Sequence, residues 1–166
     1  MPFEFDGEKY KKASAHQKEW GGKIIAEFSF SGDEHILDLG CGDGVLTAFL
    51  ADLVPAGRVL GIDSSKNMVD TARQLEKKNL QFELLDINAI HFTAAFDLIF
   101  SNATLHWILN HTRLLNNVYR ALKPGGKVRF NFAAEGNCSN FFRVIRDVMA
   151  DRQFSHFFRE DRKSVV

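Results

Sequence analysis

Hydrophobic and polar residues are arranged along this chain in two different patterns. Short apolar runs, each short enough for one buried strand, occur at residues 36–39, 58–63, 80–86, 96–100 and 127–132. Between these runs, apolar residues recur every three or four positions, as on one face of a helix. Strands that alternate with helices predict a parallel sheet with right-handed crossovers and helices on both faces. The pattern therefore predicts an α/β fold, a Rossmann-like doubly wound sheet.

Two more amphipathic patterns flank this alternating region, at residues 13–28 and 141–149. Phenylalanine, with 16 residues in the chain, is concentrated near both ends. We expect one domain over residues 1–160. It would consist of an N-terminal cap helix over about 10–30, a core over 35–133 and a helix over about 137–158. Core packing is the simpler interpretation of the Phe-rich ends, and a lid over an acceptor pocket is the alternative.

Composition narrows the range of partners. The 166 residues are enough for one domain, and 21 basic and 21 acidic residues give a net charge of zero. A neutral chain offers no electrostatic argument for binding nucleic acid or a membrane surface, and no apolar run is long enough to span a bilayer. Two cysteines and no signal-peptide pattern indicate a cytoplasmic protein. We expect a monomer that acts on a small molecule, with no metal site.

Candidate chemistry is concentrated in the glycine-rich segment at residues 40–44. This segment, GCGDG, follows a buried strand and precedes a helix, which is the geometry of a nucleotide-type cofactor site. Its G-x-G-x-G spacing differs from the dinucleotide pattern G-x-G-x-x-G. Asp38 and Asp43 would repel a phosphate but attract a sulfonium or an ammonium group. The acids therefore favour S-adenosylmethionine over a dinucleotide, although a dinucleotide-binding oxidoreductase remains an alternative.

Two further acids end the neighbouring strands. Asp63 ends the second strand and could accept hydrogen bonds from ribose hydroxyls. Asp86 ends the predicted third strand and could accept one from an adenine amino group, with the Ile87 backbone and side chain beside the base. Each acid taken alone is better explained as a helix N-cap or turn residue. Because parallel sheets bind ligands at the carboxyl ends of their strands, the whole set indicates a cofactor site.

The motifs, in their order along the chain, resemble those of class I S-adenosylmethionine-dependent methyltransferases. ILDLGCGDG is similar to the glycine-rich first motif, VLGIDSS to the second and LLDINAI to the adenine-contact segment. FDLIFSNATLHWI and RALKPGGKVRF resemble the fourth-strand motif and the segment before the fifth strand. The likeness covers roughly residues 10–132 and is greatest to small-molecule members of the trans-aconitate methyltransferase type. It implies the strand order 3-2-1-4-5, with the last two of the family's seven strands missing.

The resemblance and the strand-end pattern together define a candidate site. We expect the cofactor to be bound by Asp38, Gly40, Cys41, Gly42, Asp63, Ser64, Met68, Asp86, Ile87, Ser101 and Asn102. We expect acceptor or lid contacts from Tyr10, Ser14, Gln17 and Trp107. His106 is the candidate catalytic residue, as a base or as a donor to an acceptor carboxylate, and packing against Trp107 is its alternative role.

The predicted function is the transfer of a methyl group to a small molecule, with a carboxylate oxygen as the candidate acceptor atom. The end of the chain complicates this prediction. Residues 161–166 (DRKSVV) back-translate to a sequence that resembles a sequencing adapter, so we expect a non-native tail and a C-terminally truncated domain. A fragment that binds cofactor without turnover is therefore a further alternative.

Overall fold

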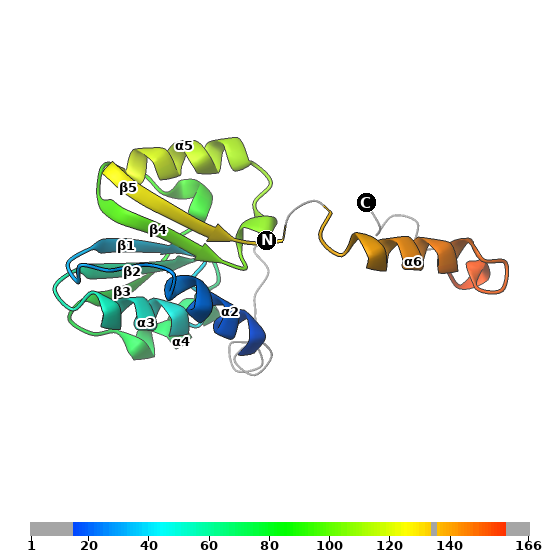
Figure 1. The fold of residues 1–166 in the computed structure, drawn as a ribbon, viewed down its shortest axis with the longest axis horizontal. Helices are drawn as coiled ribbons and strands as arrows, with labels where there is room; N and C mark the ends of the chain where they lie inside the picture. The colour runs from blue at the N-terminus through cyan, green and yellow to red at the C-terminus, as the bar shows by residue number, and fades with distance from the viewer. Residues whose placement is uncertain (1–14, 134–135, 159–166) are drawn as a thin grey trace. The chain divides into compact units, whose positions relative to one another are not determined.

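Five parallel strands form one sheet in the order β3-β2-β1-β4-β5 (Figure 1). The strands are β1 (His35–Leu39), β2 (Arg58–Asp63), β3 (Leu80–Leu84), β4 (Phe96–Asn102) and β5 (Leu122–Asn131). This computed structural model describes residues 15–133 and 136–158. The predicted doubly wound fold and its strand order are confirmed.

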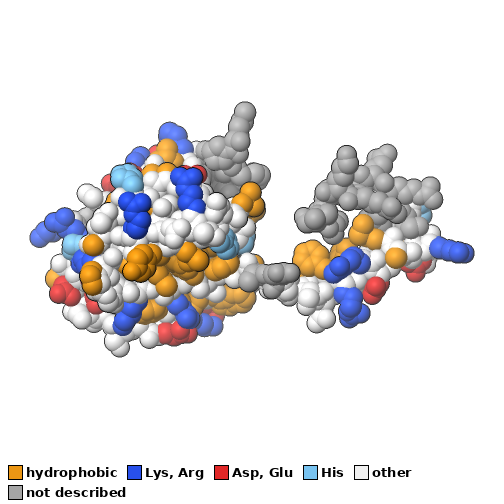
Figure 2. All heavy atoms as spheres, turned by 90° about the horizontal axis from the view of Figure 1, so that it is seen from above, with side chains coloured by type: hydrophobic (Ala, Val, Ile, Leu, Met, Phe, Trp, Pro, Cys, Tyr) orange, Lys and Arg blue, Asp and Glu red, His pale blue; other side chains and the backbone are white. Residues whose placement is uncertain are grey.

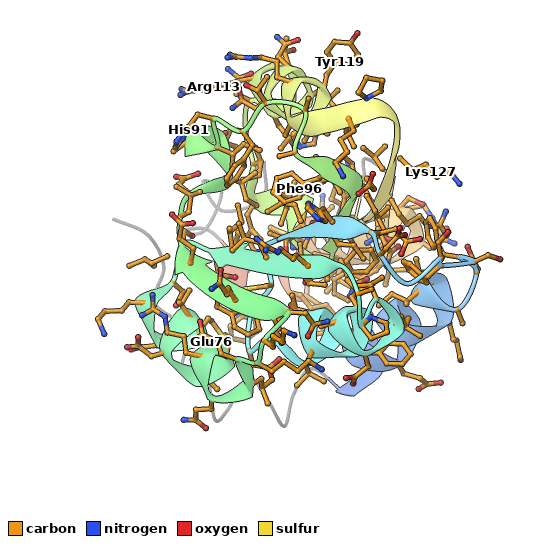
Figure 3. All side chains as sticks on the ribbon, turned by 90° about the vertical axis from the view of Figure 1, so that its left-hand side faces the viewer. Glu76, His91, Phe96, Arg113, Tyr119 and Lys127 are labelled. Carbon is orange, nitrogen blue, oxygen red and sulfur yellow. The ribbon has the colours of Figure 1, made fainter. Side chains whose placement is uncertain are left out.

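Helices cover both faces of the sheet. They are α2 (Ala15–Ile25), α3 (Val45–Leu53), α4 (Lys66–Ala72) and α5 (His111–Ala121), with short 3-10 turns η1 (Arg73–Leu75), η2 (Ile87–Ala89) and η3 (Leu105–Trp107). Helices α2, α3 and α4 lie on one face and α5 lies on the other (Figure 1). In an end-on view of the layers, Arg113 and Tyr119 on α5 lie across the sheet from Glu76 (Figure 3).

The core has two layers because successive side chains of a strand point to opposite faces. Ile36 of β1 packs in the layer beneath α2, α3 and α4, whereas the next residue, Leu37, packs beneath α5. Both side chains are fully buried. Strands buried on both faces give continuous apolar runs, which explains why short runs located β1 and β4.

The start of β5 differs from the prediction. The apolar pattern predicted a strand that begins at residue 127, but β5 begins at Leu122, directly after α5. Leu122 pairs with Phe96 and Lys127 pairs with Leu98, so the residues between them form a bulge in the ladder. Gly125, with φ of 79°, supplies the left-handed backbone that such a bulge requires.

Contacts divide the chain into two compact units, residues Met1–Phe132 and Ala133–Val166, and each is described by itself. The second unit contains α6 (Ser139–Ala150) and η4 (Ser155–Phe158), which lie within the expected lid segment. One face of α6 is apolar, and its side chains Phe141 and Val144 are exposed. Its function as a lid, and the assignment of residues 1–160 to one domain, stay predictions. The expected tail at 161–166 lies outside the described residues. Within the described part of the chain, no helix is both long and apolar enough to cross a bilayer.

Asp97 joins three strands at the end of the sheet opposite the glycine turn. Its Oδ2 accepts hydrogen bonds from the His35 backbone N–H at 2.8 Å and from Lys123 Nζ at 2.7 Å. Partial burial alone would raise the pKa of Asp97, but these hydrogen bonds outweigh burial and hold the pKa below its ordinary value. The pair is about one third exposed, so we expect Asp97→Asn to lower the free energy of unfolding at pH 7 by about 1 kcal/mol.

The pH dependence of this effect follows from the sign of the shift. Because the folded-state pKa of Asp97 is depressed, its stabilisation is present above the unfolded-state pKa and is lost as the pH falls through the folded-state pKa. Urea unfolding of both proteins should therefore show a difference at pH 7 that shrinks below about pH 4. Asp70→Asn, which breaks an exposed pair with Lys66, is the control and should have a smaller effect. An equal difference at pH 7 and pH 3 would contradict this role of Asp97.

Candidate cofactor site

The glycine turn between β1 and α3 is fastened to the neighbouring strand. The N–H groups of Gly40 and Cys41 both donate to the carbonyl of Ile62 in β2, at 2.8 and 2.9 Å. Gly40, Gly42 and Gly44 all have positive φ values, of 75°, 55° and 80°. Residues other than glycine rarely adopt a backbone with positive φ, so the turn depends on its glycines. The result is a bare main-chain surface at the carboxyl ends of β1 and β2.

Asp63, the last residue of β2, holds this turn in place. Its Oδ2 accepts from the Gly42 N–H at 3.0 Å, and its Oδ1 accepts from the Ser65 N–H at 2.9 Å. Asp63 is therefore a turn acid, as the alternative interpretation predicted, because it accepts from the N–H of Ser65, two residues further along the chain. Each carboxylate oxygen can accept more than one hydrogen bond, and Asp63 is only half-buried. Its predicted contact with ribose hydroxyls is compatible with this geometry and stays a prediction.

Asp38 has a different environment from the one the sequence suggests. Its side chain is 3% exposed, and its Oδ2 accepts a 2.7 Å hydrogen bond from the Thr47 hydroxyl in α3. Burial raises the pKa of Asp38 to about 7, against the opposing effect of the Thr47 bond. The sequence argument counted Asp38 as a full negative charge, and a pKa raised by burial to about 7 weakens that part of the argument. The charge of the site then rests more on Asp63 and Asp43.

The burial of Asp38 predicts how the stability of the protein depends on pH. Because the folded-state pKa of Asp38 lies above its unfolded value of 3.8, the folded protein binds more protons between these values. The stability that Asp38 contributes should therefore fall as the pH rises from about 4 to 7. Asp38→Asn keeps an oxygen for the Thr47 hydroxyl but cannot ionise. Between pH 5 and pH 8, urea unfolding should show the free energy of unfolding of the variant rising relative to that of the parent protein by about 2–3 kcal/mol. A constant difference across that range would contradict the burial of a titrating carboxyl.

The predicted adenine-binding segment follows β3. Asp86 Oδ1 accepts from the Asn88 N–H at 2.7 Å and from Asn88 Nδ2 at 3.0 Å, so Asp86 caps η2. Asp86 remains exposed and can accept further hydrogen bonds, whereas Ile87 packs with its side chain in the core beneath α5. Asp86 is thus an N-cap, as its alternative interpretation predicted. Its contact with adenine stays a prediction.

The other predicted cofactor residues differ in exposure. Ser101 is fully buried, and its hydroxyl donates to the Leu39 carbonyl at 2.7 Å, so it ties β4 to β1. Met68 is also buried in α4, whereas Ser64 is exposed at the end of β2. Asn102 ends β4, and its Oδ1 accepts from Asn131 Nδ2 at 2.8 Å. Of this group, Ser64 is exposed and Asn102 is partly exposed, whereas Ser101 and Met68 are buried.

Sequence reasoning missed four residues that hold the elements around the site together through protein contacts: Gly21, Thr47, Thr104 and Asn131. A Cβ at Gly21 would lie 2.3 Å from Leu46 Cδ1 and 3.2 Å from Asn102 Nδ2, so this glycine lets α2 approach the end of β4. A glycine pair inside a helical pattern was the available signal, because mid-helix glycine is costly and usually has a packing reason. Thr47, Thr104 and Asn131 act through tertiary hydrogen bonds, which no local pattern reveals.

The predicted acceptor side is only partly described. His106 and Trp107 lie in η3, just beyond β4, with ring centroids 5.2 Å apart. The predicted packing of the two rings is therefore present, and both residues are exposed. Gln17 lies in α2, but its side chain is outside the described part, as are Tyr10 and Ser14 entirely. Figure 2 shows the first unit from the α5 side, where exposed hydrophobic side chains lie between Lys and Arg side chains.

Metal-ligating residues do not cluster in the described ranges, 15–133 and 136–158: no group of three or more His, Cys, Asp or Glu could hold an ion there. Cys41 lies in the glycine turn but is buried, and burial raises the pKa of its thiol well above the ordinary value. A thiol held neutral is a weak nucleophile and a weak ligand. Cys41 thus contributes its backbone and its small size to the turn.

Known proteins share this sequence pattern and this fold. A family model described as a methyltransferase domain matches residues 36–126. Trans-aconitate 2-methyltransferase of Deinococcus radiodurans is 45% identical over 91 residues, which are 55% of this chain and 34% of that protein. Trans-aconitate 2-methyltransferase of Azoarcus sp. is 34% identical over 122 residues, 74% of this chain and 48% of that protein. The chain therefore spans half or less of the length of these curated relatives.

A solved structure agrees with these relatives. An S-adenosylmethionine-dependent methyltransferase from Mesorhizobium loti superimposes with a TM-score of 0.58 at 33% identity, covering 68% of this chain and 52% of that one. The matched residues 36–126 include the glycine turn, Asp63, Asp86 and the end of β4, which are the parts that build the candidate site. The chain belongs to the methyltransferase domain family, and its fold is that of the class I S-adenosylmethionine-dependent methyltransferases.

Proposed function

We propose that this chain binds S-adenosylmethionine at the glycine turn and transfers its methyl group to a carboxylate oxygen of a small molecule. The observation that carries this proposal is the Asp63 carboxylate, which connects Gly42 and Ser65 at the carboxyl edge of the sheet. It places an acid beside bare main chain, where a ribose can lie against backbone. The trans-aconitate 2-methyltransferases among the relatives support a carboxylate as the acceptor.

The residues present fit this cofactor. Gly40 lacks the Cβ that would otherwise crowd the turn, and the acids Asp43 and Asp63 suit a cationic ligand better than a pyrophosphate. When bound, the cofactor supplies an electrophilic methyl carbon on a positively charged sulfur. The chain's own part is to hold that end of the site in place and to orient the acceptor for in-line attack.

A carboxylate acceptor also defines the role we propose for His106. A carboxylate already carries the lone pair that attacks the methyl carbon, so the reaction needs no general base. We propose that His106, exposed beyond β4, donates a hydrogen bond that orients the acceptor carboxylate. The bound cofactor would supply the methyl carbon and would keep the electron pair of the sulfur–carbon bond, so His106 would only have to orient the acceptor oxygen. No proton has to move in this step.

Incubation with methyl-labelled cofactor tests the proposal. The label should appear in a methyl ester when trans-aconitate or another small polycarboxylic acid is the acceptor, and base treatment should release it as methanol. His106→Ala should lower transfer by about tenfold, while the affinity for S-adenosylhomocysteine stays within about threefold. Binding of S-adenosylhomocysteine without transfer to any carboxylic acid would contradict the proposed acceptor and favour a cofactor-binding function. Incorporation of label into an amine or a hydroxyl would replace the carboxylate.

A further inference from the structure

One side chain, Thr104, ties the end of β4 to the glycine turn. Its hydroxyl donates to the Gly40 carbonyl at 3.1 Å and has the Asn102 carbonyl as a second acceptor at 3.2 Å. Thr104 directly precedes η3, and the Trp107 N–H donates to the Thr104 carbonyl at 3.0 Å. A single residue therefore connects the cofactor turn to the segment that carries His106 and Trp107.

Packing enforces the same connection. Gly40 has φ of 75°, and a Cβ built on it would lie 2.1 Å from Thr104 Cγ2, 2.4 Å from Oγ1 and 2.6 Å from Cβ. The Thr104 side chain thus occupies the space that glycine leaves open. Gly40 and Thr104 are therefore in close packing contact, and a shift of the turn toward η3 would displace Thr104.

The backbone before Thr104 is shaped to make this contact. Ala103 has φ of 55°, a left-handed conformation that costs a non-glycine residue of the order of 1 kcal/mol. Its N–H donates to the Asn131 carbonyl of β5 at 2.7 Å, which holds the kink in place. The kink turns the chain out of β4 at the residue that meets Gly40. A strained backbone held by a neighbouring strand is typical of functional sites.

The segment after Thr104 is fixed at its other end as well. His111 Nε2 lies 3.0 Å from the Leu105 carbonyl, so this nitrogen carries the proton and donates. The His111 ring also stacks edge-to-face on Phe132, with centroids 5.7 Å apart. Between the two anchors, Trp107 is 65% exposed. The segment can therefore respond to the glycine turn as a unit, through Thr104.

We propose that Thr104 is a positioning residue that couples occupancy of the glycine turn to the placement of η3. Through this coupling it sets where His106 and Trp107 lie relative to the methyl group to be transferred. The inference rests on the proposed function, because it takes the glycine turn to be the cofactor site. It concerns the hydroxyl and the shape of Thr104, which touches protein groups and is not itself a catalytic residue.

Trp107 provides a direct readout, because the chain has two tryptophans and the other, Trp20, can be replaced by Phe. In this Trp20→Phe background, titration with S-adenosylhomocysteine should change the emission of Trp107. Thr104→Ser keeps the hydroxyl and should keep the change. Thr104→Val keeps the shape without the hydroxyl and should reduce its amplitude at least about fivefold. The dissociation constant, measured by calorimetry, should stay within about threefold in both variants.

Circular dichroism identifies variants that fold, and Thr104→Ala serves as a second hydroxyl-free variant. A full Trp107 response in either folded hydroxyl-free variant would overturn the coupling. So would loss of the response in a folded Thr104→Ser protein, or no response in a background protein that binds S-adenosylhomocysteine. If calorimetry detects no binding by the background protein, the proposed function itself fails and the coupling fails with it. A change in emission amplitude at constant affinity separates positioning from a purely structural role, which would lower stability and leave the response intact.

Discussion

Asp63→Ala is expected to weaken the binding of S-adenosylhomocysteine at least about 100-fold, or roughly 3 kcal/mol. The substitution removes both acceptors that hold the site, because Oδ2 binds the Gly42 N–H and Oδ1 binds the Ser65 N–H. It also removes the predicted partner of the ribose hydroxyls. Each charge-assisted hydrogen bond of this kind contributes about 1.5–3 kcal/mol, so the loss of several should exceed the effect of any surface acid. Isothermal titration calorimetry measures the change.

Two control variants separate the possible causes. Asp63→Asn keeps one side-chain oxygen as an acceptor but loses the charge, and we expect an intermediate loss of about tenfold. Asp70→Ala removes an exposed acid from α4, one turn after the Ser65 cap, and should bind like the parent protein. Binding by Asp63→Ala within threefold of the parent would show that the ligand does not contact this strand end.

Gly40→Ala is expected to have the second large effect, on stability and on binding together. The added Cβ would meet three Thr104 atoms at 2.1–2.6 Å in a backbone with φ of 75°. Left-handed backbone costs alanine about 1 kcal/mol, and the overlap adds about 1–3 kcal/mol of forced movement. We expect the free energy of unfolding to fall by about 2–4 kcal/mol and the affinity for S-adenosylhomocysteine to fall at least about tenfold.

Gly125→Ala is a matched control for this substitution. Gly125 has nearly the same φ, 79°, but a Cβ on it would have nothing within 4 Å. It should therefore lose only the backbone contribution, about 1 kcal/mol, and keep its affinity for the ligand. Urea unfolding and calorimetry on both variants measure the difference. Equal losses in the two proteins would mean that the contact between Gly40 and Thr104 has no energetic weight.

The sheet could be predicted from the sequence because burial on both faces gives short continuous apolar runs. Strand β2 was predicted with its observed bounds, residues 58–63, since Pro-Ala-Gly before it and the acid Asp63 at its end mark both limits. The start of β5 was missed because Pro124 and the two glycines after it normally signal a turn. Here the pairing of Leu122 with Phe96 continues the ladder across a bulge. Tertiary pairing overrode local turn chemistry in this segment.

The chemistry of the site was harder to predict than its location. The acid at Asp38 was identified from its place in the strand, but its charge depends on burial beside Thr47, nine residues along the chain. The contact between Thr104 and Gly40 joins residues 64 positions apart. Hydrogen bonds of this kind depend on the packed sheet, so no periodicity or spacing in the sequence contains them. The local motif therefore located the cofactor turn, and only the fold shows how the turn connects to β4.

The most direct test of the account is a calorimetric titration of the unmodified chain with S-adenosylhomocysteine and, separately, with NAD⁺. The glycine spacing and the acids Asp43 and Asp63 disfavour a pyrophosphate and suit a ligand that carries an ammonium group. We expect S-adenosylhomocysteine to bind with 1:1 stoichiometry, at least about 100-fold more tightly than NAD⁺. Binding of NAD⁺ at the same site, without binding of S-adenosylhomocysteine, would contradict the assignment of the glycine turn to a methyl-donor cofactor.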